Sequence, residues 1–408
     1  MIDFQFSSLA GRLKRSEIRE LLKLTQKPDI ISFGGGLPDP ALFPKEAVRN
    51  AAITAIDERG DLALQYSPTE GDAFLKEQVA LFMQRQGEQV APEDILITAS
   101  SQQALDLIGK VFIDPGSPII VEKPTYLGAI QAFRMYNAEF HGIEMDYDGM
   151  IPEQLEKEVK SLCLAGRKPR FVYIISDFQN PSGITLSLER RKRVLEIASR
   201  YDLLVIEDSP YREVKFEGDL IPSLFSLDTE GRVLYTKTLS KIFCPGFRLG
   251  WMIGPDPIID KLVVAKQGTD LCTSAFVSTV AAYVIKDGYL EKQIEKSKKL
   301  YARKAKVMFE ALDKYMPKLD SLSWSKPIGG MFMWIKLPDY MDAKEIFMDA
   351  VNMNVAYVIG SAFHHDGSGK NTMRINYSYP SEEQIVTGVR CLAEVIKKRQ
   401  VVYESLAG

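Results

Sequence analysis

The residue with the most informative surroundings is Lys241, which lies in the segment TLSKIFCPGFRLGW at residues 238–251. A lysine amine acts as a nucleophile at neutral pH only when burial or neighbouring cations lower its pKa from about 10.4. Hydroxyl groups precede it on Thr238 and Ser240, and Arg248 follows. The arginine could neutralise a bound phosphate, and the hydroxyls could donate hydrogen bonds to it. A lysine beside a phosphate indicates a site for pyridoxal 5'-phosphate (PLP), whose aldehyde condenses with the amine.

Taken alone, the lysine segment is more typical of a solvated turn, so other residues must decide. Asp208 follows an apolar run and could pair with the pyridine nitrogen of PLP, although a turn cap is equally typical of such an aspartate. Asn180 and Tyr211 could both donate hydrogen bonds to the phenolate oxygen of the cofactor. The NPSG motif that begins at Asn180 is by itself a turn signal.

Three further positions extend the candidate site. Ser100, Ser101 and Gln102 stand where a strand pattern changes to a helix pattern, which favours phosphate binding at a helix N-terminus or an ordinary serine cap. Tyr126 could stack on the pyridine ring, or it could be a core aromatic. Arg374 lies in an alternating strand pattern, where either a substrate carboxylate or a structural salt bridge would pair with it.

The elements that must position these residues alternate between strands and helices. Short apolar runs predict buried strands, and residues 102–108 and 187–201 have the pattern of helices. Continuous apolar runs separated by helices are typical of a mostly parallel sheet that is covered on both faces. Ligands of such sheets bind beyond the carboxyl ends of the strands, where these polar residues are expected to meet. The expected strands are 94–98, 118–122, 170–175, 203–206, 233–236 and 249–253.

The length and patterning predict an α/β protein with a large and a small domain. We expect residues 1–45 to form an N-terminal arm and part of the small domain, and residues 46–290 to form the large PLP-binding domain. Residues 291–408 would begin with a long charged helix and continue as a small α+β domain.

The composition excludes several classes of protein. The 408 residues are 46% hydrophobic and 26% charged, with a net charge of −3, so we expect no general attraction to nucleic acid or anionic membranes. No apolar run approaches the roughly 20 residues that span a bilayer. The start lacks the regions of a secretion signal, which favours a cytoplasmic protein. The scattered cysteines and the three histidines predict reduced thiols and no metal site.

Taken in order, these segments resemble the PLP-dependent aminotransferases of fold type I, class I/II. The chain is most similar to the subfamily of α-aminoadipate and kynurenine aminotransferases, and the resemblance covers nearly all of it. Besides the lysine segment, it rests on IRELLK (18–23), ISFGGGLP (31–38), QYSPTEG (65–71), SQQALDL (101–107) and MRINY (373–377).

The resemblance assigns a role to each candidate residue. Lys241 would form the Schiff base and shuttle the proton, and Arg374 would bind the substrate α-carboxylate beneath the loop that contains Gly36. Arg19 would bind the distal carboxylate of an acidic substrate. Tyr66 would reach the phosphate in the neighbouring subunit, which implies a homodimer with shared active sites. The ring-binding set would be Asp208, Asn180, Tyr211 and Tyr126, and the phosphate-binding set would be Ser100, Ser101, Gln102, Thr238, Ser240 and Arg248.

Three positions depart from the family pattern. Ser100 replaces the usual glycine of the phosphate loop. Ser209 and Pro210 follow Asp208 in place of an acidic and a small residue. The loop around His364 and His365 is more polar than usual, which could alter the selection of substrate side chains.

The resemblance implies a ping-pong aminotransferase that uses an L-amino acid and a 2-oxo acid, with 2-oxoglutarate as the expected common partner. Aminoadipate, aromatic and branched aliphatic amino acids all suit the other position. A PLP-dependent β-lyase or decarboxylase is the enzymatic alternative. A ligand-sensing domain of a transcription regulator is disfavoured, because the similarity begins by about residue 16 and leaves no room for a DNA-binding segment.

Overall fold

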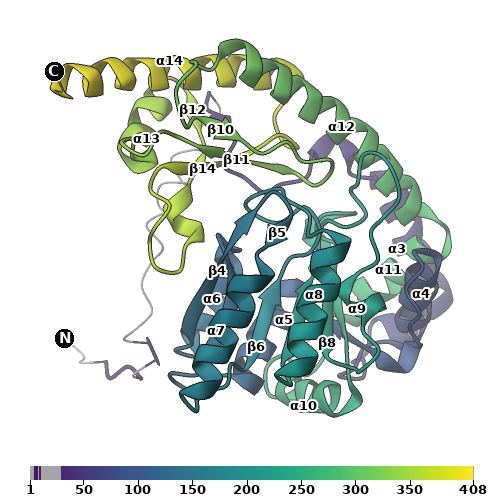
Figure 1. Ribbon diagram of the computed structural model, residues 1–408. Helices are drawn as coiled ribbons and strands as arrows, with labels where there is room; N and C mark the ends of the chain where they lie inside the picture. Colours follow the sequence, from purple (N-terminus) through teal and green to yellow (C-terminus); the bar gives the residue numbers. More distant parts are fainter. Residues whose placement is uncertain (1–3, 8, 11–28, 408) are drawn as a thin grey trace.

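An eight-stranded sheet forms the centre of the computed structural model, which describes residues 4–7, 9–10 and 29–407 (Figure 1). From β8 through β7, β6 and β3 to β4 the strands pair in parallel, whereas β9 is antiparallel to both neighbours and β5 is antiparallel to β4. The expected mostly parallel sheet is confirmed. In sheet order the strands are β2 (Ile95–Thr98), β9 (Gly250–Ile253), β8 (Val233–Thr238), β7 (Leu204–Asp208), β6 (Phe171–Ile174), β3 (Pro118–Lys123), β4 (Glu139–Asp146) and β5 (Gly149–Met150).

Both faces of this sheet are buried, because alternate residues of a strand point into two separate hydrophobic clusters. Ile120 belongs to one cluster, whereas Ile119 and Val121 belong to the other. Helices α7 (Pro152–Leu164), α8 (Leu188–Arg200) and α9 (Leu224–Leu227) contribute to the smaller cluster. The larger cluster includes residues of α4 (Ala73–Arg85), α5 (Ser100–Phe112), α6 (Leu127–Met135), α10 (Asp256–Gln267) and α11 (Ala275–Lys286).

A second, four-stranded antiparallel sheet forms the smaller part of the molecule. Its order is β10 (Ser323–Trp324), β11 (Phe332–Lys336), β14 (Thr372–Asn376) and β13 (Val358–Ile359). Separately, β1 (Ile31–Ser32) pairs in parallel with β12 (Val355–Ala356), so a segment near the N-terminus lies against the C-terminal part. The division of the chain near residues 45 and 290 stays a prediction.

Long helices connect and cover the two sheets. α12 (Tyr289–Tyr315) extends from the side of the large sheet to the small one, where α14 (Glu382–Ala407) packs on it (Figure 1). Between residues 29 and 407 the other helices are α3 (Lys45–Ala63), α13 (Ala343–Asn352) and the short 3-10 helices Pro40–Leu42, Pro92–Asp94, Pro245–Phe247 and Gly360–Phe363. No helix in the described ranges is long and apolar enough to cross a membrane.

Candidate active site

A cavity of about 850 Å³ opens beyond the carboxyl ends of β2, β7 and β8, the edge at which ligands bind in open sheets. Most of the residues that the sequence predicts for the site line this one cavity. They are Ser100, Ser101, Gln102, Tyr126, Asp208, Tyr211, Thr238, Ser240, Lys241 and Arg248.

Lys241 follows β8 and projects its amine toward the loop at Gly36. Its Nζ donates a hydrogen bond of 2.6 Å to the Gly36 carbonyl oxygen. Burial lowers the pKa of Lys241 to about 8, and the cations Arg374 and Arg248 contribute in the same direction. Because this pKa is close to neutral, part of the lysine population carries a neutral, nucleophilic amine.

A cluster of hydroxyl groups lies at one end of the cavity. The hydroxyl oxygen of Ser100 is 3.4 Å from that of Thr238 and 3.3 Å from that of Ser240. Thr238 also donates to Ser240 across 2.9 Å. The first turn of α5, which begins at Ser100, adds backbone N–H groups, and exposed Arg248 adds a positive charge. Converging hydroxyls, a helix N-terminus and a guanidinium form a suitable site for phosphate.

The backbone at position 100 has a conformation that favours glycine. Ser100 has a φ of 71°, in the left-handed region that glycine adopts without steric penalty. The serine side chain joins the hydroxyl cluster, so it adds a phosphate donor that glycine would lack. Gly250 on the adjoining strand makes this packing possible, because a Cβ there would lie 3.0 Å from the Ser100 carbonyl carbon.

Asp208 ends β7 with its carboxylate buried at the wall of the cavity. Oδ2 accepts a hydrogen bond of 2.7 Å from the hydroxyl of Tyr173, and Oδ1 is buried without a partner. Burial raises the pKa of Asp208 to about 6. A buried acceptor without a donor is unfavourable, so this oxygen fits a ligand that brings an N–H group, such as a pyridinium. Tyr173 was not anticipated, because a tyrosine within a buried apolar strand gives no sign of a polar role.

Asn180, Tyr211 and Arg374 form a chain of hydrogen bonds. Asn180 Nδ2 donates to the Tyr211 hydroxyl across 3.3 Å, and Arg374 Nη1 donates to Asn180 Oδ1 across 2.8 Å. Tyr211 lines the cavity. Asn180 does not line it, but it donates a hydrogen bond directly to Tyr211. Two groups that can donate hydrogen bonds therefore lie side by side, Tyr211 in the cavity wall and Asn180 directly behind it.

Arg374 is buried between aromatic rings. Its guanidinium carbon lies 4.2 Å from the centre of the Phe332 ring and 5.0 Å from that of Phe363. Nη2 donates to the Gly34 carbonyl across 2.7 Å, whereas Nε is buried without a partner. Burial lowers the pKa of Arg374 to about 10. Arg374 donates to the neutral oxygens of Asn180 and Gly34, so its positive charge is not neutralised by these bonds and can pair with a carboxylate. The two phenylalanines come from distant segments that the sequence did not single out.

The remaining predicted residues that the structure describes are not part of the cavity lining. Gly36 is next to the lysine, since a Cβ on it would be 3.9 Å from Lys241 Nζ and 3.2 Å from Phe332. Tyr66 is 78% exposed and does not line the cavity of its own chain. Arg19 lies outside the described residues. No group of three or more histidine, cysteine or acidic side chains in the described ranges could hold a metal ion, and all four cysteines are free.

The chemistry of these groups fits PLP. The cavity brings together an amine of lowered pKa, a cluster of phosphate donors and a buried carboxylate oxygen that lacks a donor. They stand at the strand ends of a mostly parallel sheet with a smaller second sheet beside it. This combination defines a PLP-dependent enzyme of fold type I.

Comparison with known proteins identifies the family. Residues 28–392 match the model of the family "Aminotransferase class I and II". Aromatic-amino-acid aminotransferase 1 of Thermococcus litoralis is 45% identical over 394 residues, which cover 96% of this chain and 94% of that protein. The chain therefore belongs to the class I and II aminotransferases, and it is a PLP-dependent aminotransferase.

Solved structures agree with this assignment. The kynurenine aminotransferase of Pyrococcus horikoshii, crystallised in complex with PMP, has a TM-score of 0.93 at 46% identity and covers 97% of both chains. The α-aminoadipate aminotransferase of Thermus thermophilus, complexed with N-(5'-phosphopyridoxyl)-L-leucine, has a TM-score of 0.89 at 41% identity and covers 97% of this chain and 98% of that one. The expected fold class and cofactor are confirmed.

Proposed function

We propose that this aminotransferase moves the amino group of an aromatic amino acid, kynurenine or 2-aminoadipate to a 2-oxo acid, with 2-oxoglutarate as the common partner, by a ping-pong mechanism. The names of three similar proteins support the donor class, because they specify aromatic amino acids, kynurenine and α-aminoadipate. A branched aliphatic donor belongs to the same proposal, since the Thermus enzyme was crystallised with a leucine derivative of the cofactor.

Lys241 is the proposed catalytic residue. When bound, PLP supplies an aldehyde that condenses with amines and a ring that takes up negative charge. Lys241 contributes the amine at Nζ. After the substrate displaces it, the same atom takes a proton from the substrate α-carbon and holds it for return. The pKa of about 8 that burial gives Lys241 makes its neutral form accessible for both roles.

The cofactor-binding roles follow the chemistry of each group. Asp208 Oδ1 would accept a hydrogen bond from the ring N–H and keep that nitrogen protonated, and Tyr126 would cover one face of the ring. Asn180 and Tyr211 would donate to the phenolate oxygen. The phosphate would accept hydrogen bonds from hydroxyl groups and from the N-terminus of α5, and it would pair with a guanidinium. These groups belong to Ser100, Ser101, Gln102, Thr238, Ser240 and Arg248.

Arg374 would anchor the α-carboxylate of the substrate. Phe332 and Phe363 remove water from around its guanidinium, and a charge-assisted pair gains strength in such surroundings. Gly36 would lie over the bound substrate, and its carbonyl already accepts a bond from Lys241. The role of Arg19 at a distal carboxylate remains a proposal from the sequence.

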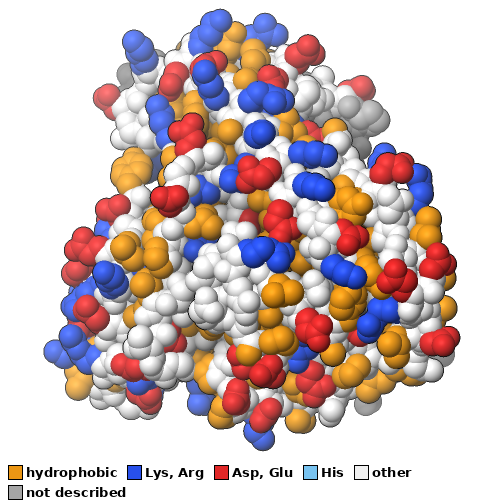
Figure 2. All heavy atoms as spheres, turned by 90° about the vertical axis from the view of Figure 1, so that its right-hand side faces the viewer, with side chains coloured by type: hydrophobic (Ala, Val, Ile, Leu, Met, Phe, Trp, Pro, Cys, Tyr) orange, Lys and Arg blue, Asp and Glu red, His pale blue; other side chains and the backbone are white. Residues whose placement is uncertain are grey.

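The active unit is proposed to be a homodimer with shared sites, in which Tyr66 reaches the phosphate of the neighbouring subunit. Support comes from the exposure of this segment, where Leu62 is 59%, Leu64 72% and Tyr66 78% exposed. Exposed apolar side chains that gather on one segment are typical of interfaces. The side of the molecule that includes α3, α4 and α12 also has hydrophobic side chains among its charges (Figure 2).

The observation that carries the proposal is the half-buried Lys241, whose amine shares one cavity with Asp208 and the hydroxyl cluster. The decisive experiment mixes the PLP-loaded protein with single amino acids, including 2-aminoadipate and kynurenine, and follows the visible spectrum through one turnover. We expect aromatic donors and 2-aminoadipate to bleach the PLP band to that of pyridoxamine phosphate. A band that resists every donor would contradict the proposed substrate class.

Product analysis separates the proposal from other PLP chemistry. Release of ammonia, pyruvate or carbon dioxide without a 2-oxo acid acceptor would contradict transamination and support a lyase or decarboxylase. Absence of any PLP band in the wild-type protein would contradict the assignment of Lys241.

A further inference from the structure

A buried cluster of charged side chains lies behind the candidate site, on the opposite face of the same strands. In β7, Ile206 joins the larger hydrophobic cluster and Val205 the smaller one, so Asp208 faces the cavity side and Glu207 faces the other. Glu207 accepts hydrogen bonds from the backbone N–H groups of Leu224 and Phe225 at 3.1 Å and 2.8 Å. One face of β7 therefore points Asp208 toward the cavity, and the other points Glu207 toward the buried charged cluster.

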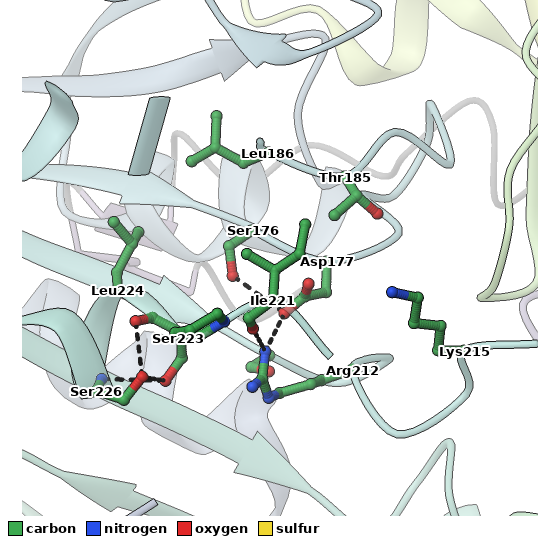
Figure 3. Close-up of polar contacts among 12 residues, drawn as sticks. Ser176, Asp177, Thr185, Leu186, Arg212, Lys215, Ile221, Ser223, Leu224 and Ser226 are labelled. Atoms are coloured by element: carbon green, nitrogen blue, oxygen red, sulfur yellow. Dashed lines mark hydrogen bonds and ion pairs between the residues drawn. The ribbon is translucent and has the colours of Figure 1, made fainter. Parts of the chain in front are cut away.

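The central contact of this cluster is the ion pair between Asp177 and Arg212 (Figure 3). Arg212 Nη1 lies 3.1 Å from Asp177 Oδ2 and donates to the Ile221 carbonyl oxygen across 2.6 Å. Both side chains are at least 96% buried, because 4% of Asp177 and 3% of Arg212 is exposed. The second carboxylate oxygen, Asp177 Oδ1, lies 2.6 Å from Arg191 Nη2.

Arg191 holds the Asp177 carboxylate in place. It belongs to α8 and its side chain is fully buried. Besides the ion pair, it donates to the carbonyl oxygens of Leu186, Pro222 and Ser176 at 2.9, 3.1 and 2.9 Å. Asp177 is therefore held from one side by a rigid helix, and through Arg212 it holds the segment that follows β7.

The sequence positions of the pair connect it to the site. Asp177 stands three residues before Asn180, and Arg212 directly follows Tyr211. Asn180 and Tyr211 are themselves hydrogen-bonded, with 3.3 Å between Asn180 Nδ2 and the Tyr211 hydroxyl oxygen. The pair of Asp177 and Arg212 thus joins the two segments that carry the two donors.

We propose that Asp177 and Arg212 are positioning residues that set the distance between Asn180 and Tyr211, and so set how strongly this pair of donors holds the phenolate oxygen of the cofactor. The inference rests on the proposed roles of Asn180 and Tyr211. A buried ion pair gives little net stability over apolar packing, but it tolerates little displacement of either partner once formed. Hydrogen bonds to a charged oxygen weaken with distance and misalignment, so this geometry controls the protonation of the bound cofactor.

The test uses the PLP-loaded protein and the pH midpoint of its visible absorption band. Arg212→Lys keeps the charge but removes the guanidinium Nη1, which donates to both Asp177 and the Ile221 carbonyl, and puts an ammonium on a shorter side chain in its place. We expect it to move the midpoint by about 0.5 to 1 pH unit, the equivalent of one ordinary hydrogen bond. In a Tyr211→Phe background the same substitution should move the midpoint much less, because one of the two positioned donors is already gone.

Two comparisons make the outcome decisive. Val159→Ala loosens α7 on the same face of the sheet without touching the charge cluster, so it should lower the melting temperature of the apoprotein and leave the midpoint unchanged. A midpoint that Arg212→Lys does not move, or moves equally with and without the Tyr211 hydroxyl, would overturn the inference. If Tyr211→Phe alone leaves the midpoint unchanged, the proposed role of Tyr211 fails instead. Asp177→Glu, which keeps the charge and lengthens the side chain, replaces Arg212→Lys if that variant does not fold.

Discussion

Arg374 donates a hydrogen bond of 2.8 Å to Asn180, across 194 residues of sequence. The proposed anchor of the substrate carboxylate is therefore bonded to a proposed ligand of the cofactor. With these proposed roles, a substrate that binds to the arginine would also change the surroundings of Asn180, so substrate binding and the electronic state of the cofactor would be coupled through one contact.

Replacing Arg374 tests this coupling. In Arg374→Ala we expect amino acid binding to weaken by about 2 to 5 kcal/mol, a rise in KM of at least about thirty-fold, because a buried charge-assisted pair is lost. The variant should also shift the visible band of bound PLP, since Asn180 loses its donor. Steady-state kinetics and absorbance titrations measure the two effects. Arg399→Ala, which removes a half-buried ion pair with Asp349 in the C-terminal region, is the control. An unchanged KM for every substrate would refute the role of Arg374.

Replacing Lys241 tests the attachment of the cofactor. Lys241→Ala should lower turnover by several orders of magnitude, because both the nucleophile and the proton carrier are removed. After reduction with borohydride, mass spectrometry should find the mass of the cofactor on the peptide that contains residue 241 in the wild-type protein and on none in the variant. Lys306→Ala, on the exposed surface of α12, should behave as wild type. Normal turnover in Lys241→Ala would disprove the site assignment.

The buried carboxyl of Glu122 predicts a pH dependence of stability. Burial raises its pKa to about 8 from the usual 4.5, even though Ile175 N–H and Gln179 donate to Oε2. A raised carboxyl pKa means that the folded state favours the protonated form. The stabilisation is therefore complete below about pH 4.5 and is lost as the pH rises through about 8.

Glu122→Gln should remove this dependence, because an amide does not ionise. We expect the apoprotein of the variant to gain stability relative to wild type as the pH rises from 5 to 8, by an amount of at most about 5 kcal/mol. Chemical denaturation at several pH values measures the difference. Glu144→Gln, on the more exposed neighbouring strand, should leave the pH profile of wild type. A constant difference between Glu122→Gln and wild type across this range would contradict the prediction.

Tyr66 tests the proposed dimer. Tyr66→Phe should weaken PLP binding by roughly ten-fold or more, because one hydrogen bond to a charged phosphate is removed, and it should leave the dimer intact. Equilibrium titration with PLP and light scattering measure affinity and mass. Tyr147→Phe is the matched control, since that tyrosine is 81% exposed in the short turn between β4 and β5. A monomeric wild-type protein with full PLP affinity would contradict the shared site.

The sequence predicts the parallel core of the large sheet well, because strands buried on both faces appear as continuous apolar runs. The runs expected at 118–122 and 233–236 correspond to β3 (Pro118–Lys123) and β8 (Val233–Thr238). β4 (Glu139–Asp146) was missed, since most of its residues are partly exposed and make no such run. The antiparallel direction of β9 was also missed, because an apolar pattern carries no information about strand direction.

Much of the site could be predicted for a related reason, since polar residues that follow parallel strands meet at one edge. Their partners could not. Tyr173 bonds to Asp208 across 35 residues, and the pair of Asp177 with Arg212 spans the same distance in sequence. Each of these residues looks ordinary in its own segment, and only the packing of the strands brings them together.

The hydrogen bond from Lys241 to the Gly36 carbonyl oxygen connects the proposed catalytic amine to the loop beside the cavity. Gly36 belongs to the segment 34–38, and Leu37 of that segment borders the cavity. If the Lys241 amine were bonded to PLP, the Gly36 carbonyl would lose this donor and the contact would be released. We therefore expect limited proteolysis to cut this segment faster in the PLP-loaded protein than in the apoprotein. Loading with cofactor would thus loosen the segment that borders the cavity.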